Sequence, residues 1–194
     1  MRVGLNELAE KIRNGLFMAA SRTYGEQYIE PFVRAHYGLN SPSSDDHDGV
    51  HPSTGDRYEI KAAKVLTSRI DSPKLSLIER ILSEVTNTEL HRMVPYANRY
   101  SAEYGANIQN VKRAHFDFLI YVLLFSDRVT VFKVAAKDIN NPNIPNWSDK
   151  HGRYDQHGMS GQFNINKNSL RSHEERFFQD VLTYEDLSER YKSL

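Results

Sequence analysis

A nearly continuous apolar run between residues 115 and 125 constrains the fold of this chain more than any other feature. Every residue from Phe118 to Phe125 is aliphatic or aromatic. An unbroken run of this length, without the alternation of a half-exposed strand, is typical of a strand that is buried on both faces. A short polar turn, 126–128, separates it from a second apolar stretch, 129–136. The pair predicts a hairpin at the centre of a layered structure.

Apolar residues at helical spacing predict helices around this sheet. They cover residues 5–20, about 24–37, 74–88, 169–183 and 185–194. Gly38 is expected to end the second of these helices, and Pro31 is expected to kink it. A short strand is expected near 162–166. Together with a further hairpin at 45–61, these elements predict one α/β domain over residues 1–194, with a central mixed sheet of four to six strands flanked by helices.

The composition is that of an ordinary globular protein, with 39% hydrophobic and 26% charged residues. The chain contains no cysteine, which excludes disulfides and thiolate-bound zinc. A reducing cytoplasm is the expected location, and no apolar run approaches the length of a membrane span. The formal net charge is zero. This argues against a protein that coats polyanions in general, but acids elsewhere can offset a local basic groove.

The hairpin at 45–61 carries the main chemical signal. Residues 53–56 (Ser-Thr-Gly-Asp) have turn chemistry, and the following residues alternate between apolar and charged side chains. A turn centred on Thr54 and Gly55 places Asp48 opposite Lys61, and Val50 opposite Glu59. Because opposite residues of antiparallel strands point to the same face, Asp48, Glu59 and Lys61 are expected to project together. Asp45 and Asp46 are rivals to Asp48.

Two carboxylates beside a lysine suit metal-assisted hydrolysis of a phosphodiester. Mg²⁺ prefers carboxylate oxygens and keeps several waters. It would polarise the phosphoryl group and make a bound water more acidic. Lys61 would either orient or deprotonate that water, or stabilise the negative charge that develops on the phosphate. The main-chain carbonyl of Ile60 is an expected additional ligand, and its side chain is expected to face the core.

At these residues the chain resembles the PD-(D/E)xK nuclease superfamily, and most of all its small type II restriction endonucleases. The family pattern is an Asp near a strand start, a short hairpin and then Glu-x-Lys, matched here by Asp48 and by Glu59-Ile60-Lys61. The Pro of the family name is replaced by His47. The resemblance implies a restriction-endonuclease-like core, one or two Mg²⁺ ions on the two acids and a lysine that assists the attacking water. It also implies an acid from an early helix, here Glu26 or Glu30.

Polar and basic stretches elsewhere are interpreted as contacts to DNA. Lysine and arginine contact phosphates, whereas amides and guanidinium groups read base edges. The predicted DNA-contacting residues are Lys64, Arg69, Asn110, Lys112, Arg113, Lys150, His151, Arg153, Gln156, Ser160 and Gln162. The resulting hypothesis is a Mg²⁺-dependent, sequence-specific endonuclease for double-stranded DNA that acts as a homodimer and does not contact membranes.

Other interpretations of the same residues stay open. The 45–61 hairpin is also compatible with a solvated surface hairpin. His151 and His157 with Asn164 or Asn166, followed by a helix carrying His173, would suit a His-Asn-His nuclease site. A repair or junction nuclease on the same scaffold, and a non-catalytic DNA-binding protein, are the alternative functions.

Overall fold

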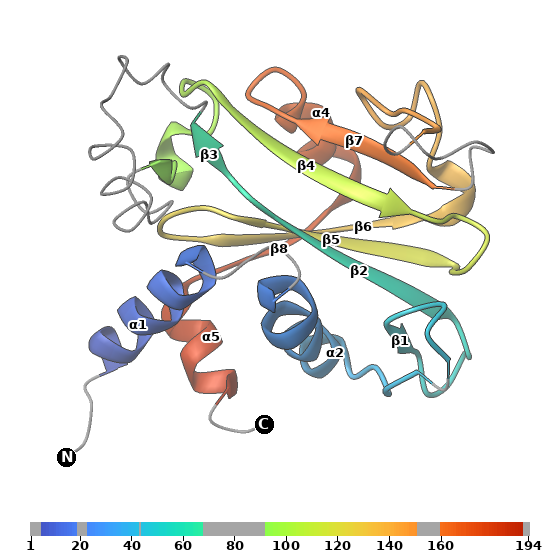
Figure 1. Cartoon of the computed structure of the whole chain (residues 1–194), viewed down its shortest axis with the longest axis horizontal. Helices are drawn as coiled ribbons and strands as arrows, with labels where there is room; N and C mark the ends of the chain where they lie inside the picture. Colours follow the sequence, from blue (N-terminus) through green and yellow to red (C-terminus); the bar gives the residue numbers. More distant parts are fainter. Residues whose placement is uncertain (1–4, 19–22, 43, 68–91, 151–159, 192–194) are drawn as a thin grey trace, which may run out of the picture.

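The core is a five-stranded mixed sheet with the strand order β1-β2-β5-β6-β8 (Figure 1). The computed structural model describes residues 5–18, 23–42, 44–67, 92–150 and 160–191. The sheet contains β1 (Gly49–Val50), β2 (Arg57–Lys64), β5 (Phe118–Leu124), β6 (Val129–Ala135) and β8 (Phe178–Leu182). Strand β2 is parallel to β5, and all other neighbours are antiparallel. The predicted α/β class, with a central mixed sheet of four to six strands, is confirmed.

The apolar run at 118–125 forms the central strand, as predicted. Residues Leu119 to Leu124 of β5 are completely buried, and β6 pairs with β5 as the second strand of the predicted hairpin. Alternate residues of β5 enter different clusters. Ile120 and Val122 face the helices, while Leu119, Tyr121 and Leu123 face the opposite side. A strand covered on both faces needs apolar residues at every position, which explains the unbroken pattern.

A second, three-stranded antiparallel sheet covers one face of the central sheet (Figure 1). It contains β3 (Leu66–Thr67), β4 (Tyr104–Val111) and β7 (Gly161–Ile165), in the order β3-β4-β7. The strand expected near 162–166 is therefore confirmed as β7. The sequence did not predict β4 as a strand. Its alternating burial places Ala106 and Ile108 in the core and Asn107 and Gln109 at the surface.

Helices cover the other face of the central sheet (Figure 1). They are α1 (Leu5–Met18), the π-helical segment η1 (Thr23–Ile29), α2 (Glu30–Tyr37) and α5 (Tyr184–Tyr191). The expected helix at 24–37 is divided between η1 and α2, with Pro31 in the first turn of α2, where the missing N–H costs nothing. Gly38 ends α2 with φ 62°, as its lack of a Cβ favours.

Helix α4 (Leu170–Phe177) packs beside the second sheet and carries a buried histidine. Nδ1 of His173 lies 2.8 Å from Oη of Tyr121, and its ring stacks on Phe163 at 5.6 Å between centroids. Burial lowers the pKa of His173 to about 4. His173 is therefore a neutral core residue.

Short 3₁₀ segments lie in the connections between strands, at Tyr96–Asn98 before β4 and at Ala136–Asp138 after β6.

The prediction of one helix over 169–183 is wrong in its second half. The chain leaves α4 at Phe177 and continues as the edge strand β8. Phe178 and Val181 stay about 40% exposed, because β8 pairs with β6 on one side only.

The helix predicted at 74–88 lies outside the described residues. Within the described ranges, no helix combines the length and apolar character that spanning a membrane requires.

Candidate active site

The predicted hairpin forms, but its register differs by two residues from the expected one. Gly49 is opposite Tyr58 and Val50 is opposite Arg57, so the expected pairs of Asp48 with Lys61 and Val50 with Glu59 are wrong. The turn occupies residues 52–55, closed by a 2.9 Å hydrogen bond from His51 N–H to the Asp56 carbonyl. Gly55 has φ 74°. A shift of two residues keeps every side chain on its expected face, because the strand period is two.

The three predicted site residues converge on one point. Nζ of Lys61 lies 3.7 Å from Oδ2 of Asp48 and forms an ion pair with Oε1 of Glu59. The side chains are largely buried, with 22% of Asp48, 11% of Glu59 and 23% of Lys61 exposed. The predicted convergence is confirmed, and a fully solvated surface hairpin does not describe these residues.

The main chain of β2 orients the Asp48 carboxylate. The N–H of Ile60 donates a 2.7 Å hydrogen bond to Oδ2 of Asp48, the residue just before the short strand β1 begins. In an extended strand the N–H and C=O of one residue point to the same edge. The carbonyl of Ile60 therefore leaves β2 on the Asp48 side, as a main-chain ligand would require. The Ile60 side chain is 1% exposed and lies in the helix-side core, as predicted.

Helix α2 brings a third carboxylate, Glu30, to this group. Burial first, and then the charge of Asp48, raises the pKa of Glu30 to about 7, while the charges of Lys61 and Arg34 oppose this rise. The side chain of Glu30 is 15% exposed, whereas Glu26 is at the surface. Of the two acids proposed from the early helix, Glu30 is the one that the structure places beside the hairpin.

Arg34, one helical turn after Glu30, was not among the residues predicted from the sequence. Its Nη1 lies 3.9 Å from Oε2 of Glu30 and donates a 3.1 Å hydrogen bond to the main-chain carbonyl of Asp48. The spacing of four residues between Glu30 and Arg34 was the available signal, because such residues are neighbours on a helix. The spacing alone does not show that Arg34 also reaches the hairpin.

The charges around Lys61 determine its protonation state. Burial alone would lower the pKa of Lys61, but the charges of Glu59 and Asp48 outweigh burial and raise it. Burial raises the pKa of Glu59, and the charges of Lys61 and, more weakly, Lys112 act in the opposite direction. Lys61 is therefore an ammonium ion here. In this form it can orient a water or stabilise negative charge, whereas the predicted role of general base requires the neutral amine, which the charges of Glu59 and Asp48 disfavour.

The donor atoms at this position fit a hard divalent cation. Asp48 and Glu59 supply carboxylate oxygens and Ile60 supplies a carbonyl, and Mg²⁺ binds such oxygen ligands while it keeps several waters. Among the described residues, no three His, Cys, Asp or Glu side chains are arranged as a metal-binding group. The protein side chains offered to a cation are thus two acids, with Glu30 nearby, and the Lys61 ammonium occupies the same oxygens.

The predicted DNA-contacting residues divide into several groups. Lys112 follows β4 at the surface, close enough for its charge to favour ionised Glu59. Asn110 is exposed in β4 with φ 57°, and Lys150 is exposed. Lys64 and Arg113, in contrast, are buried or already bonded to other parts of the protein. Lys64 is 9% exposed with its ammonium 4.7 Å from the Tyr24 ring centroid, and Arg113 donates to the Ile139 carbonyl at 2.7 Å.

The remaining predicted contacts lie on β7 or outside the described residues. Ser160 is 9% exposed, and Gln162 is half-buried on β7 with its main chain bonded to Ser148. The residues outside the described ranges are Arg69, His151, Arg153 and Gln156. His157 of the alternative His-Asn-His site lies there too. The burial of His173 and its contact with Tyr121 do not favour that alternative.

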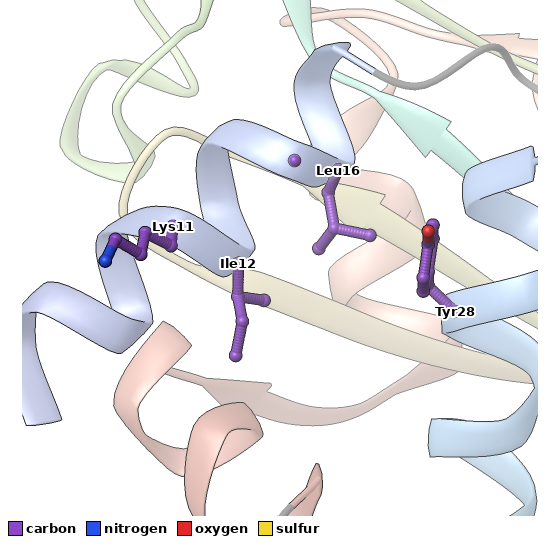
Figure 2. A pocket seen from close by; sticks show the side chains of 5 residues that line it. Lys11, Ile12, Leu16 and Tyr28 are labelled. Carbon is purple, nitrogen blue, oxygen red and sulfur yellow. The ribbon is translucent and has the colours of Figure 1, made fainter. Parts of the chain in front are cut away.

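An apolar cavity of about 340 Å³ lies against α1, and its lining includes none of Asp48, Glu59 and Glu30. Figure 2 shows Ile12 and Leu16 of α1 on one side of it and Tyr28 on the other; Lys11 and Gly15 complete the lining. Among the described residues that line it there is no acid, so they offer no carboxylate ligand for a hard cation. Asp48, Glu59 and Lys61 are the candidate catalytic group.

Comparison of the chain with models of known protein families gives no match, and comparison with curated proteins gives none either.

Proposed function

We propose that this protein is a Mg²⁺-dependent endonuclease that cleaves double-stranded DNA at a specific sequence, as a type II restriction enzyme does. The observation that carries the proposal is the convergence of Asp48, Glu59 and Lys61 on one face of the hairpin. Two buried acids held together by an ammonium ion are costly to fold, because each desolvated charge needs a partner. A functional role therefore explains this group of buried charges better than a purely structural role does.

The chain's own residues have distinct roles in this proposal. Asp48 and Glu59, with the Ile60 carbonyl, would hold Mg²⁺, and Glu30 would support them from α2. When bound, Mg²⁺ would supply Lewis-acid polarisation of a phosphodiester and lower the pKa of a water. Displaced from the carboxylates by the cation, the ammonium of Lys61 would orient the attacking water and stabilise charge that develops on the phosphate. Lys112 would contact a phosphate beside Glu59.

The second sheet suits sequence reading. Asn107 and Gln109 of β4 face outwards, and Asn164 of β7 is opposite Asn107. A two-stranded ribbon fits the major groove, and amide side chains there can pair with adenine edges. Two-fold related copies would match a palindromic site, so we propose that the protein acts as a homodimer. We further propose that it acts in a bacterial-type cytoplasm.

The direct test is digestion of unmodified plasmid and phage DNA with and without Mg²⁺, followed by sequencing of the ends. Discrete fragments with one short common sequence at the ends, formed only with Mg²⁺, are the expected result. Cleavage confined to branched or damaged DNA would replace the proposal with a repair or junction nuclease. DNA binding without cleavage under any divalent cation would identify a non-catalytic binding protein.

A further inference from the structure

Arg34 connects two parts of the candidate active site that come from different elements. Its Nη1 donates to the Asp48 carbonyl at 3.1 Å and lies 3.9 Å from Oε2 of Glu30. Its side chain is only 23% exposed, so these contacts are made largely away from bulk water. An arginine has donors in a rigid planar group, and it can therefore fix two acceptors relative to each other.

The surroundings of Arg34 give this contact a defined geometry. After the left-handed Gly38, Asn40 pairs with Val50 through hydrogen bonds of 2.9 and 3.0 Å, which attaches the end of α2 to β1. A Cβ added at Gly49 would lie 3.2 Å from Leu39 Cδ1 and 3.5 Å from Arg34 Cγ. A side chain at Gly49 would thus crowd Leu39, which follows α2, and would touch the Arg34 stem at ordinary van der Waals distance, so the stem runs directly beside the hairpin main chain.

We infer that Arg34 is a positioning residue, which holds the main chain of Asp48 so that its carboxylate meets the Ile60 N–H and is presented to the cation. Only the link to the cation rests on the proposed function. The orientation of Asp48 is a property of the protein alone.

A purely electrostatic role for Arg34 predicts the opposite effect on cation binding. Removal of a positive charge beside the site would by itself strengthen Mg²⁺ binding. Removal of a positioning contact weakens it, because the carboxylate must then be ordered when the ion binds. The sign of the change in affinity therefore separates the two roles.

The first measurement needs no metal. Amide hydrogen exchange of the full chain, followed by NMR, reports the bond from Ile60 N–H to Asp48 directly. In Arg34→Met, which keeps much of the side-chain stem, we expect the Ile60 amide to exchange about tenfold faster or more, relative to other β2 amides. Asp48→Ala sets the rate for complete loss of the bond. An Ile60 rate equal to the wild type in Arg34→Met overturns the inference, whatever happens to cleavage.

Arg99→Met is the matched control. Arg99 is also 23% exposed and pairs with a 16% exposed acid, Glu174, at 3.1 Å, but it lies on the loop before β4. Arg99→Met should leave the Ile60 rate unchanged even if both variants lose similar global stability. An equal acceleration in both variants would identify general loosening and overturn the inference.

The second measurement concerns the cation. Calorimetric titration with Mg²⁺ alone should show about three- to tenfold weaker binding in Arg34→Met and an intermediate value in Arg34→Lys, which retains the positive charge and N–H donors but not the planar guanidinium. Unchanged or tighter Mg²⁺ binding in Arg34→Met contradicts the positioning role at the site. Faster Ile60 exchange in a protein whose wild type binds no Mg²⁺ would support the orientation of Asp48 by Arg34 and reject the nuclease instead.

Discussion

The main-chain N–H of Ile60 donates a 2.7 Å hydrogen bond to the carboxylate of Asp48. The same residue places its side chain, 1% exposed, in the core between the central sheet and the helices. One buried residue thereby fixes an acid on the neighbouring chain segment. The acid's orientation depends on the packing of β2, and not only on its own strand.

Replacement of Lys61 tests the assigned chemistry. In Lys61→Met we expect DNA binding within a few-fold of the wild type and cleavage reduced by about a hundredfold or more, because the cation that stabilises developing charge is lost. Gel-shift affinity and single-turnover cleavage measure the two effects. Lys11→Met, at an exposed position on α1, is the control and should cleave normally. Cleavage by Lys61→Met near the wild-type rate would refute the assignment.

Replacement of the two early acids decides which of them supports the site. Glu30→Gln should slow Mg²⁺-dependent cleavage by about tenfold or more, since Glu30 lies near Asp48 and Lys61. Glu26→Gln should have little effect, because Glu26 is exposed and only weakly raises the pKa of Glu30. The comparison is made at saturating DNA over a range of Mg²⁺ concentrations. A larger loss in Glu26→Gln than in Glu30→Gln would reverse the assignment.

His173 should make the stability of the protein depend on pH. Its pKa is about 4 when folded, below the usual value near 6.5, so only the unfolded chain takes up a proton between these values. The stability that neutral His173 contributes is fully present above pH 6.5 and is lost as the pH falls towards 4. The free energy of unfolding should therefore decrease by about 2 kcal/mol between pH 7 and pH 5. Urea unfolding at both values measures it. The pH dependence should be smaller by this amount in His173→Gln, and an unchanged dependence would contradict a neutral His173.

Gly49→Ala should loosen the hairpin. The added Cβ would meet Leu39 at 3.2 and 3.3 Å, so Leu39 must move by a few tenths of an ångström. We expect a loss of about 1–2 kcal/mol in unfolding free energy, together with slower cleavage. Gly25→Ala is the control, because nothing in the described part of the chain, apart from its chain neighbours and its own helix backbone, lies within 4 Å of its added Cβ. Equal stability of Gly49→Ala and the wild type would show that the contact with α2 is not tight.

Local patterns predicted the elements whose burial is unambiguous. The uninterrupted run of β5 needed no tertiary information, because few environments accept apolar residues at every position. The alternation of β2 likewise placed Glu59 and Lys61 on the face opposite Ile60. The exact register was predicted incorrectly, since His51 and Asp56 close the turn earlier than the Thr54-Gly55 signal suggested. The end of α4 and the start of β8 were missed, because pairing with β6, and not local sequence, determines the state of residues 178–182.

The amino-acid sequence by itself determined which residue types reach the site and on which strand face they lie, because side-chain parity follows from the strand period alone. Only the tertiary structure decided that Glu30 and not Glu26 approaches Asp48, and that Arg34 reaches the hairpin main chain. These relationships depend on how α2 packs against β1. That packing is set by the left-handed turn at Gly38, the pairing of Asn40 with Val50 and the absence of a side chain at Gly49. These features bring together segments that are distant in the sequence, and no local sequence pattern encodes the resulting distances.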